Sequence, residues 1–298
     1  LGTTVSSLCY IDLDNEPDNI HELSIQQVFP NKREVTDTKL PSVVYTKNST
    51  LYIGKGAEEM KYSSIRDMNV FYSAKSQLGQ KHIYHLSKSA DITHPYQVSG
   101  LILKALLNSF TKNVCDDIQK CNFVITVPAS FGGSQRTDTI KAIKESGIEV
   151  NEGMLVDEPN AAFVGYTKQL NEFSLPEGTK VLVFDMGGGT TDISILEINS
   201  IDSDSMDVRN LAVSRYDLLG GDDIDSHLAY EFLYKILLDQ NDITNNEFSF
   251  SKKEKIVISR LKKIAKSLKE GIVDKVTWHI NQSNQSQDNI IDWDSIPN

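Results

Sequence analysis

The stretch from Val181 to Ser194, VLVFDMGGGTTDIS, carries residue types suited to binding a phosphate group. Apolar residues 181–184 predict a buried strand, the three glycines predict a tight turn, and strand character resumes over 190–196. Such a turn lets backbone N–H groups approach an anion without obstruction by Cβ atoms. Asp185 and Asp192 flank the turn, and their carboxylates suit a hydrated Mg²⁺. The segment therefore predicts a hairpin for a nucleotide phosphate and its metal, although the same glycines could simply supply positive φ.

A second unit of this kind opens the chain. Residues 1–13 begin with Gly2, Thr3 and Thr4 and continue into a strand pattern. This order of a turn followed by a strand resembles residues 187–195. The two segments indicate a duplicated phosphate-holding unit.

Composition bounds the class of protein. The length of 298 residues, with 39% hydrophobic and 8% aromatic residues, predicts a globular chain of two domains or of two lobes. A net charge of -11 argues against broad attraction to nucleic acid or anionic membranes. Cys9, Cys115 and Cys121 are odd in number and lack CxxC spacing, so we expect a reducing, cytoplasmic compartment. No apolar run reaches the ~18 residues that span a bilayer. The start at Leu1 reads as a cut into a longer chain.

The first half alternates strands and helices, as expected of an α/β protein. A helix is predicted from Pro95, because apolar residues follow it at spacings of three and four up to Phe110. A later helix should stop at Gly147. The predicted strands are 24–28, 42–45, 51–54, 123–127 and 148–156, and the predicted helices are 56–61, 95–110, 134–146 and 159–168.

The second half should begin after a linker at residues 170–178. Beyond the central hairpin we expect strands at 207–216 and 273–280 and helices at 223–238 and 251–270. The apolar stripe of the first of these helices should be Ile224, Leu228, Phe232 and Ile236, and that of the second Ile256, Leu261, Ile264 and Leu268.

Six motifs in order carry a resemblance to a known family. They are LGTT at Leu1, AKSQLG around Lys75, ITVPASFGGSQR at 125–136, DEPNAA at 157–162, FDMGGGTTD at 184–192 and LLGGDD at 218–223. In this order they resemble the nucleotide-binding domain of the heat-shock protein 70 family. The resemblance implies an actin-like α/β fold of two lobes, each with a mixed β-sheet flanked by helices, and ATP or ADP with Mg²⁺ between them. Residues 1–172 would form lobe I without its first strand, and 173–298 lobe II without its C-terminal end.

The resemblance also implies roles for individual residues. Lys75 would stabilise charge on the γ-phosphate, Glu158 would order water near the metal, and Asp185 and Asp192 would orient the metal's waters or the attacking water. The residues implied to hold the β- and γ-phosphates are Gly2, Thr3 and Thr4 in one lobe and Gly187, Gly188, Gly189 and Thr190 in the other. Gly220 and Gly221 would approach the ribose and α-phosphate, Lys266 would contact adenine, and Pro128 and Arg136 would relay the nucleotide state.

Several of these residues also have a purely structural interpretation. Lys75 could be a solvated lysine, and Glu158 a carboxylate that favours a helix N-terminus. Gly220 and Gly221 could form a plain strand-to-helix turn. Pro128 could simply end a strand, Arg136 could lie on the surface, and Lys266 could be a solvated lysine on an amphipathic helix.

The function that the resemblance implies is ATP hydrolysis that gates peptide binding in a monomeric, cytoplasmic chaperone of the stress response. Its partners would be unfolded peptide, bound elsewhere, with a J-domain co-chaperone and a nucleotide-exchange factor. Two alternatives stay open. One is a nucleotide-binding regulator without catalysis or a filament-forming actin relative, and the other is a sugar or carboxylate kinase of the same fold.

Overall fold

The computed structural model describes residues 1–63, 69–81, 83–84, 92–169, 175–201, 206–214, 219–240 and 252–271. Contacts between Cα atoms divide the chain into two compact units. The first covers Leu1–Glu58 and Asn69–Gly220, and the second Glu59–Met68 and Gly221–Asn298. The linker predicted at 170–178 falls partly outside the described residues, and the strand predicted at 273–280 lies wholly outside them. The lobe boundary at 172/173 stays a prediction.

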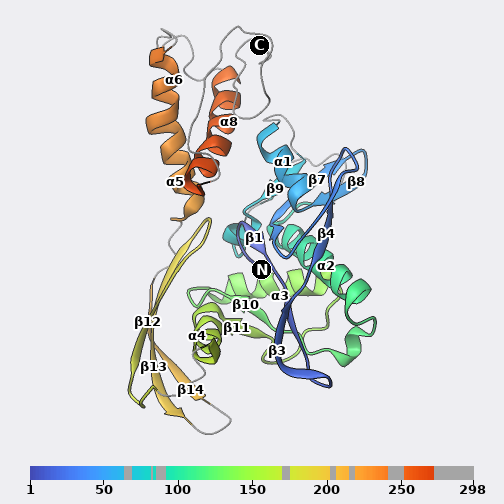
Figure 1. The fold of residues 1–298 in the computed structure, drawn as a ribbon, viewed down its shortest axis with the longest axis vertical. Coiled ribbons are helices and arrows are strands. Elements are labelled where there is room, and N and C mark those ends of the chain that lie inside the picture. Colours follow the sequence, from blue (N-terminus) through green and yellow to red (C-terminus); the bar gives the residue numbers. More distant parts are fainter. Residues whose placement is uncertain are drawn as a thin grey trace. The chain divides into compact units, whose positions relative to one another are not determined.

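The first unit starts with short antiparallel strands (Figure 1). β1 pairs with β6, β2 with β3, β4 with β5, and β7 with both β8 and β9. The predicted strands at 24–28, 42–45 and 51–54 are confirmed as β4, β7 and β8. The sequence did not indicate β3, because its EPDNIHE segment is almost wholly exposed and has no alternation of apolar residues. The bounds are β1 Val5–Ser6, β2 Cys9–Asp12, β3 Glu16–Glu22, β4 Ile25–Val28, β5 Glu34–Asp37, β6 Leu40–Pro41, β7 Val43–Lys47, β8 Thr50–Ile53 and β9 Val70–Tyr72.

Helix α2, Pro95–Asn113, lies between two layers of the core. One face, with Val98, Ile102, Leu106 and Phe110, packs on side chains of the strands. Another face packs Leu103 and Leu107 on Ala142 and Ile143 of α3. Burial of each large apolar side chain contributes about 1.5–3 kcal/mol, so the two faces tie the strands to α3. The 3₁₀ turns of this unit are η1, Ala74–Gln77, and η2, Ile118–Lys120. Helix α1, Lys55–Ser63, belongs to this unit up to Glu58 and to the second unit from Glu59.

Strands β10, Ile125–Val127, and β11, Leu155–Asp157, form a parallel pair joined by helix α3, Gly133–Ser146. Gly147 ends α3 in the left-handed region at φ 95°, as predicted. The strand predicted at 148–156 was too long, because the residues before Leu155 form a loop that contacts β10 through one hydrogen bond, from the Ile125 amide to the Met154 carbonyl at 2.8 Å. Val127 and Asp157 pair at the carboxyl ends of the two strands. The segments that follow, including helix α4, Glu158–Gln169, therefore begin at one edge.

Two glycines with open surroundings give a test of backbone conformation. A Cβ added at Gly165, within α4, or at Gly147 would meet nothing within 4 Å. They differ in φ, because Gly147 lies at +95° and Gly165 has no positive φ. We expect Gly165→Ala to raise the free energy of unfolding by about 0.5–1 kcal/mol. Gly147→Ala should lower it by about 1 kcal/mol. Denaturant titration of both variants measures this, and a loss of stability in Gly165→Ala would contradict the expectation.

The rest of the first unit is an antiparallel sheet of β12, Lys180–Met186, β13, Thr191–Ile201, and β14, Met206–Val213 (Figure 1). The predicted central hairpin is confirmed as β12 and β13. Its inner face buries Leu196 and Ile198 against Phe163 of α4. On its outer face Leu182 and Phe184 are 65% and 61% exposed. The hairpin therefore packs on α4 through its inner face. Asp192 and Ser194 lie on this same face.

The second unit contains helix α5, Gly221–His227, the π-helix η3, Leu228–Leu233, and helices α6, Tyr234–Gln240, and α8, Lys252–Lys269. The stripe predicted for 251–270 is confirmed, since Leu261 and Ile264 are buried and Ile256 and Leu268 pack on them. The stripe predicted for 223–238 was wrong at three of its four positions, since Leu228 alone of the four packs against the core of this unit. Ile224, Phe232 and Ile236 are exposed, whereas Ala229, Tyr234, Leu237 and Leu238 form the core. The π-helical turn has more residues per turn than an α-helix, and it therefore rotates the following residues onto a different face.

None of the helices in the described part of the chain combines the length and the apolar character needed to cross a membrane.

Candidate functional site

Three glycine-bearing segments of the first unit meet at one point. A Cβ added at Gly188 would lie 2.1 Å from Cγ2 of Thr4, and one at Gly189 2.7 Å from Cγ2 of Thr3. A Cβ at Gly220 would lie 2.6 Å from the backbone of Gly188. Real Cβ atoms do not approach other atoms so closely, so these positions accept glycine alone without a shift of the backbone or of a neighbour. The turn that opens the chain, the central turn and Gly220 are therefore brought together, as the sequence predicts.

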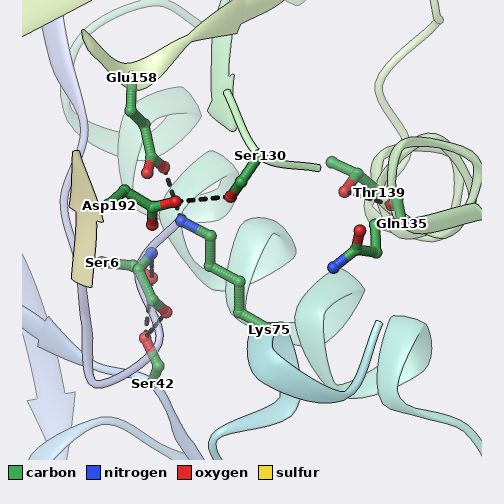
Figure 2. A network of polar contacts seen from close by, with 9 residues as sticks. Ser6, Ser42, Lys75, Ser130, Gln135, Thr139, Glu158 and Asp192 are labelled. Carbon is green, nitrogen blue, oxygen red and sulfur yellow. Dashed lines mark hydrogen bonds and ion pairs between the residues drawn. The ribbon is translucent and has the colours of Figure 1, made fainter. Parts of the chain in front are cut away.

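Two buried serines shape the turn that opens the chain. The Gly2 amide donates to Ser6 Oγ at 3.1 Å, and Ser42 Oγ donates to the Gly2 carbonyl at 2.8 Å. The two hydroxyls lie 2.9 Å apart (Figure 2). A Cβ at Gly2 would lie 1.9 Å from the Val5 carbonyl oxygen, so the turn also requires glycine here. The sequence did not single out Ser6 or Ser42, because serine is common in turns and nothing local indicates a partner 36 residues away.

The central turn joins β12 to β13 and carries the two predicted carboxylates. Asp185 pairs directly with Asp192, and the Gly187 amide donates to the Thr190 carbonyl at 2.9 Å. Asp192 is 6% exposed, whereas Asp185 is exposed. Thr191 Oγ1 donates to the Leu219 carbonyl at 2.6 Å, which holds the segment before Gly220 against the hairpin.

Lys75 is 8% exposed, so it is not a solvated surface lysine. Its Nζ lies 2.6 Å from Oε1 of Glu158, the first residue of α4 (Figure 2). The buried ion pair thus places one positive and one negative charge beside the turn that opens the chain. Lys75 and Glu158 lie 83 residues apart in the sequence.

Asp192 has a partner that the sequence did not indicate. Ser130 Oγ donates a hydrogen bond of 2.5 Å to Asp192 Oδ1 (Figure 2). Pro128 and Arg136 flank Ser130, and Arg136 donates to the Asp157 carboxylate at 2.6 Å and to the Phe131 carbonyl at 3.0 Å. Arg136 is therefore not a simple surface arginine, since it ties the turn after β10 to the end of β11. A serine two residues after a strand-ending proline was the one available signal, and it is too common to be decisive.

Gly221 and Lys266 lie in the second unit and are described there. Gly221 is the first residue of α5, and its carbonyl accepts a hydrogen bond of 2.8 Å from Lys269 Nζ. Lys269 also lies 2.8 Å from the Asp225 carboxylate, which is buried. The predicted roles of Gly221 and Lys266 toward the nucleotide stay predictions.

The donor set of the first unit fits a nucleotide phosphate and a hydrated cation. The glycine turns approach their neighbours so closely that an added Cβ would collide, and Lys75 brings a buried cation next to the Glu158 carboxylate. Among the described residues, no cluster of three or more His, Cys, Asp or Glu side chains is arranged to ligate a metal ion. The carboxylates of Asp185 and Asp192, which pair across the hairpin, have the chemistry to accept hydrogen bonds from the waters of a hydrated Mg²⁺.

Comparison with known proteins decides the family. The sequence profile of the family described as Hsp70 protein matches residues 26–294. The chain belongs to the Hsp70 family. The predicted resemblance is thereby confirmed, and with it the actin-like ATPase fold that the family implies.

The Hsp70 chain also resembles curated relatives. It is 30% identical over 281 residues to "Chaperone protein DnaK" of Mycoplasma mobile, a match that covers 94% of this chain and 41% of the relative. It is 33% identical over 255 residues to "Chaperone protein dnaK" of Cyanidium caldarium, covering 77% and 36%. A third relative of that name, from Cyanidioschyzon merolae, is 34% identical over 227 residues, covering 68% and 34%. The chain thus spans about two fifths or less of the length of these relatives.

Proposed function

We propose that this Hsp70 chain binds ATP and hydrolyses it to ADP and phosphate, and that hydrolysis gates peptide binding elsewhere in the natural protein. The observation that carries the proposal is the convergence of the two turns, the buried ion pair of Lys75 with Glu158, and Asp192 in one unit. Phosphoryl transfer of this kind depends on positioning and neutralisation of charge rather than on a covalent nucleophile.

The residues divide this task between them. Backbone N–H groups of the turns that contain Gly2 and Gly188 would bind phosphate oxygens. The Lys75 ammonium would compensate the negative charge that develops on the γ-phosphate. The ion pair with Glu158 orients this ammonium group. Asp185 and Asp192 would accept hydrogen bonds from the attacking water and orient it. Mg²⁺, which Asp185 and Asp192 would hold through water, would supply further positive charge at the phosphates.

The relatives' names as chaperone proteins motivate proposals about partners. A chaperone of this family would act on unfolded peptide, with a J-domain co-chaperone and a nucleotide-exchange factor. We propose that the protein works as a monomer in the cytoplasm and takes part in the stress response. These proposals extend beyond the residues described.

The test is turnover of ATP by the natural full-length protein, measured as phosphate release with Mg²⁺ present. We expect slow release that does not respond to sugars or acetate. Release stimulated by a sugar or by acetate would instead favour a kinase. Tight ATP binding without any release would favour a regulator that does not hydrolyse its nucleotide.

A further inference from the structure

Ser130 is the feature of the site that neither the sequence nor the family resemblance assigned. It lies in the turn after β10, and its hydroxyl donates a hydrogen bond of 2.5 Å to Oδ1 of Asp192 on β13, 62 residues later. A hydrogen bond from a hydroxyl to a carboxylate is expected at 2.5–2.7 Å and is stronger than one between neutral groups. The contact is thus of the strong, charge-assisted kind.

The turn that carries Ser130 is anchored on both sides. The Phe131 amide donates to the Pro128 carbonyl at 3.0 Å, which closes the turn around Ser130. Phe131 is 4% exposed and packs with Leu78 and Val127. Arg136 Nε donates to the Phe131 carbonyl at 3.0 Å and so restrains the backbone that follows Ser130. The hydroxyl of Ser130 is therefore held in place by the turn itself, and no flexible loop has to become ordered. A hydroxyl held in this way can orient the side chain to which it donates.

The partner needs such a donor. Asp192 is 6% exposed, and a buried carboxylate without hydrogen bonds loses its hydration without compensation. Ser130 engages Oδ1, so this contact does not use the hydrogen-bonding capacity of Oδ2. Asp185, which pairs with Asp192 across the hairpin, is exposed and has no such restraint in the contacts of the described residues. The two carboxylates are therefore unequal, and Asp192 is the oriented one.

We propose that Ser130 is a positioning residue that fixes the Asp192 carboxylate so that its second oxygen orders the attacking water or a water on the metal. The inference rests on the proposed ATPase function, whose chemistry is sensitive to the position of such groups. A displacement of about 1 Å at a reacting centre can cost about 100-fold in rate. Ser130 itself touches neither the substrate nor the reacting atoms.

The test compares Ser130→Ala with Ser130→Thr in the natural full-length protein, by single-turnover ATP hydrolysis and equilibrium ATP titration. We expect Ser130→Ala to lower the hydrolysis rate about 10- to 100-fold while ATP affinity stays within about threefold. Ser130→Thr keeps a hydroxyl and should restore the rate to within about threefold of wild type. The matched control is Ser146→Ala, which removes a buried hydroxyl that donates at 2.7 Å to Ile143 within α3, and it should leave the rate unchanged.

A second comparison separates action through Asp192 from a general loss of structure. In an Asp192→Asn background, Ser130→Ala should change the rate by less than about twofold, because the positioned carboxylate is already gone. A normal rate in Ser130→Ala would overturn the inference and leave the ATPase proposal intact. An equal loss in Ser130→Thr, or a full additive loss in the double variant, would also overturn it. A wild-type protein without turnover would contradict the ATPase proposal itself, and the positioning role would fall with it.

Discussion

Replacement of Lys75 by alanine is expected to lower ATP turnover at least about 100-fold while ATP affinity stays within about tenfold. An interaction that strengthens as charge develops on the γ-phosphate affects the transition state more than the bound ground state. Lys75 is suited to this, because it is 8% exposed and its cation acts where water screens it little. Single-turnover hydrolysis and equilibrium titration of the natural full-length protein measure the two quantities separately.

The ion pair with Glu158 adds a structural cost that the experiment must separate. Removal of one partner of a buried pair leaves the other charge uncompensated and can cost about 3–5 kcal/mol of stability. Glu158→Gln breaks the same pair but retains the lysine, so its free energy of unfolding shows how much of the Lys75→Ala effect comes from instability. Lys141→Ala removes a half-exposed lysine that pairs with Asp138 on α3, and it should leave turnover unchanged. Unchanged turnover in a folded Lys75→Ala protein would contradict the assigned role.

Replacement of Gly188 by alanine is expected to weaken ATP binding about 10- to 100-fold and to destabilise the first unit by about 1–3 kcal/mol. The added Cβ would lie 2.1 Å from Cγ2, 2.3 Å from Oγ1 and 2.7 Å from Cβ of Thr4. Rotation of the Thr4 side chain cannot relieve the last contact, because the Cβ atom does not move with χ1. The two turns must therefore separate, and the backbone N–H groups proposed to bind phosphate separate with them.

Calorimetric ATP titration and denaturant unfolding test this expectation together. Gly133→Ala is the matched control, since a Cβ there would meet nothing within 4 Å and α3 begins at this residue. It should leave both quantities within error of wild type or slightly raise stability. Wild-type affinity and stability in Gly188→Ala would show that the two turns do not meet as described.

Local patterns predicted most elements, and the failures have identifiable causes. Helix α2 and the hairpin of β12 and β13 follow from apolar spacing and a glycine turn, which are properties of short segments. The strand predicted at 148–156 is only Leu155–Asp157 in the structure, because a strand needs a paired neighbour and β10 has three residues that pair with it. The stripe predicted for 223–238 failed at Phe232 and Ile236 because the π-helix η3 shifts the helical phase, which spacing rules for an α-helix cannot anticipate.

By itself, the sequence predicted the family, which the comparison confirms. It also predicted phosphate binding by the two turns and roles for Lys75, Glu158 and Asp192, and these stay predictions. These depend on residue types within short motifs, where glycine is required by backbone geometry and charge by chemistry. The tertiary structure decided which of these motifs touch. It placed Lys75 on Glu158, Gly188 on Thr4, and Ser130 on Asp192. The physical reason is that each contact joins residues far apart in the chain. Such a contact forms only when the elements of the first unit pack together, and no local sequence pattern determines that packing.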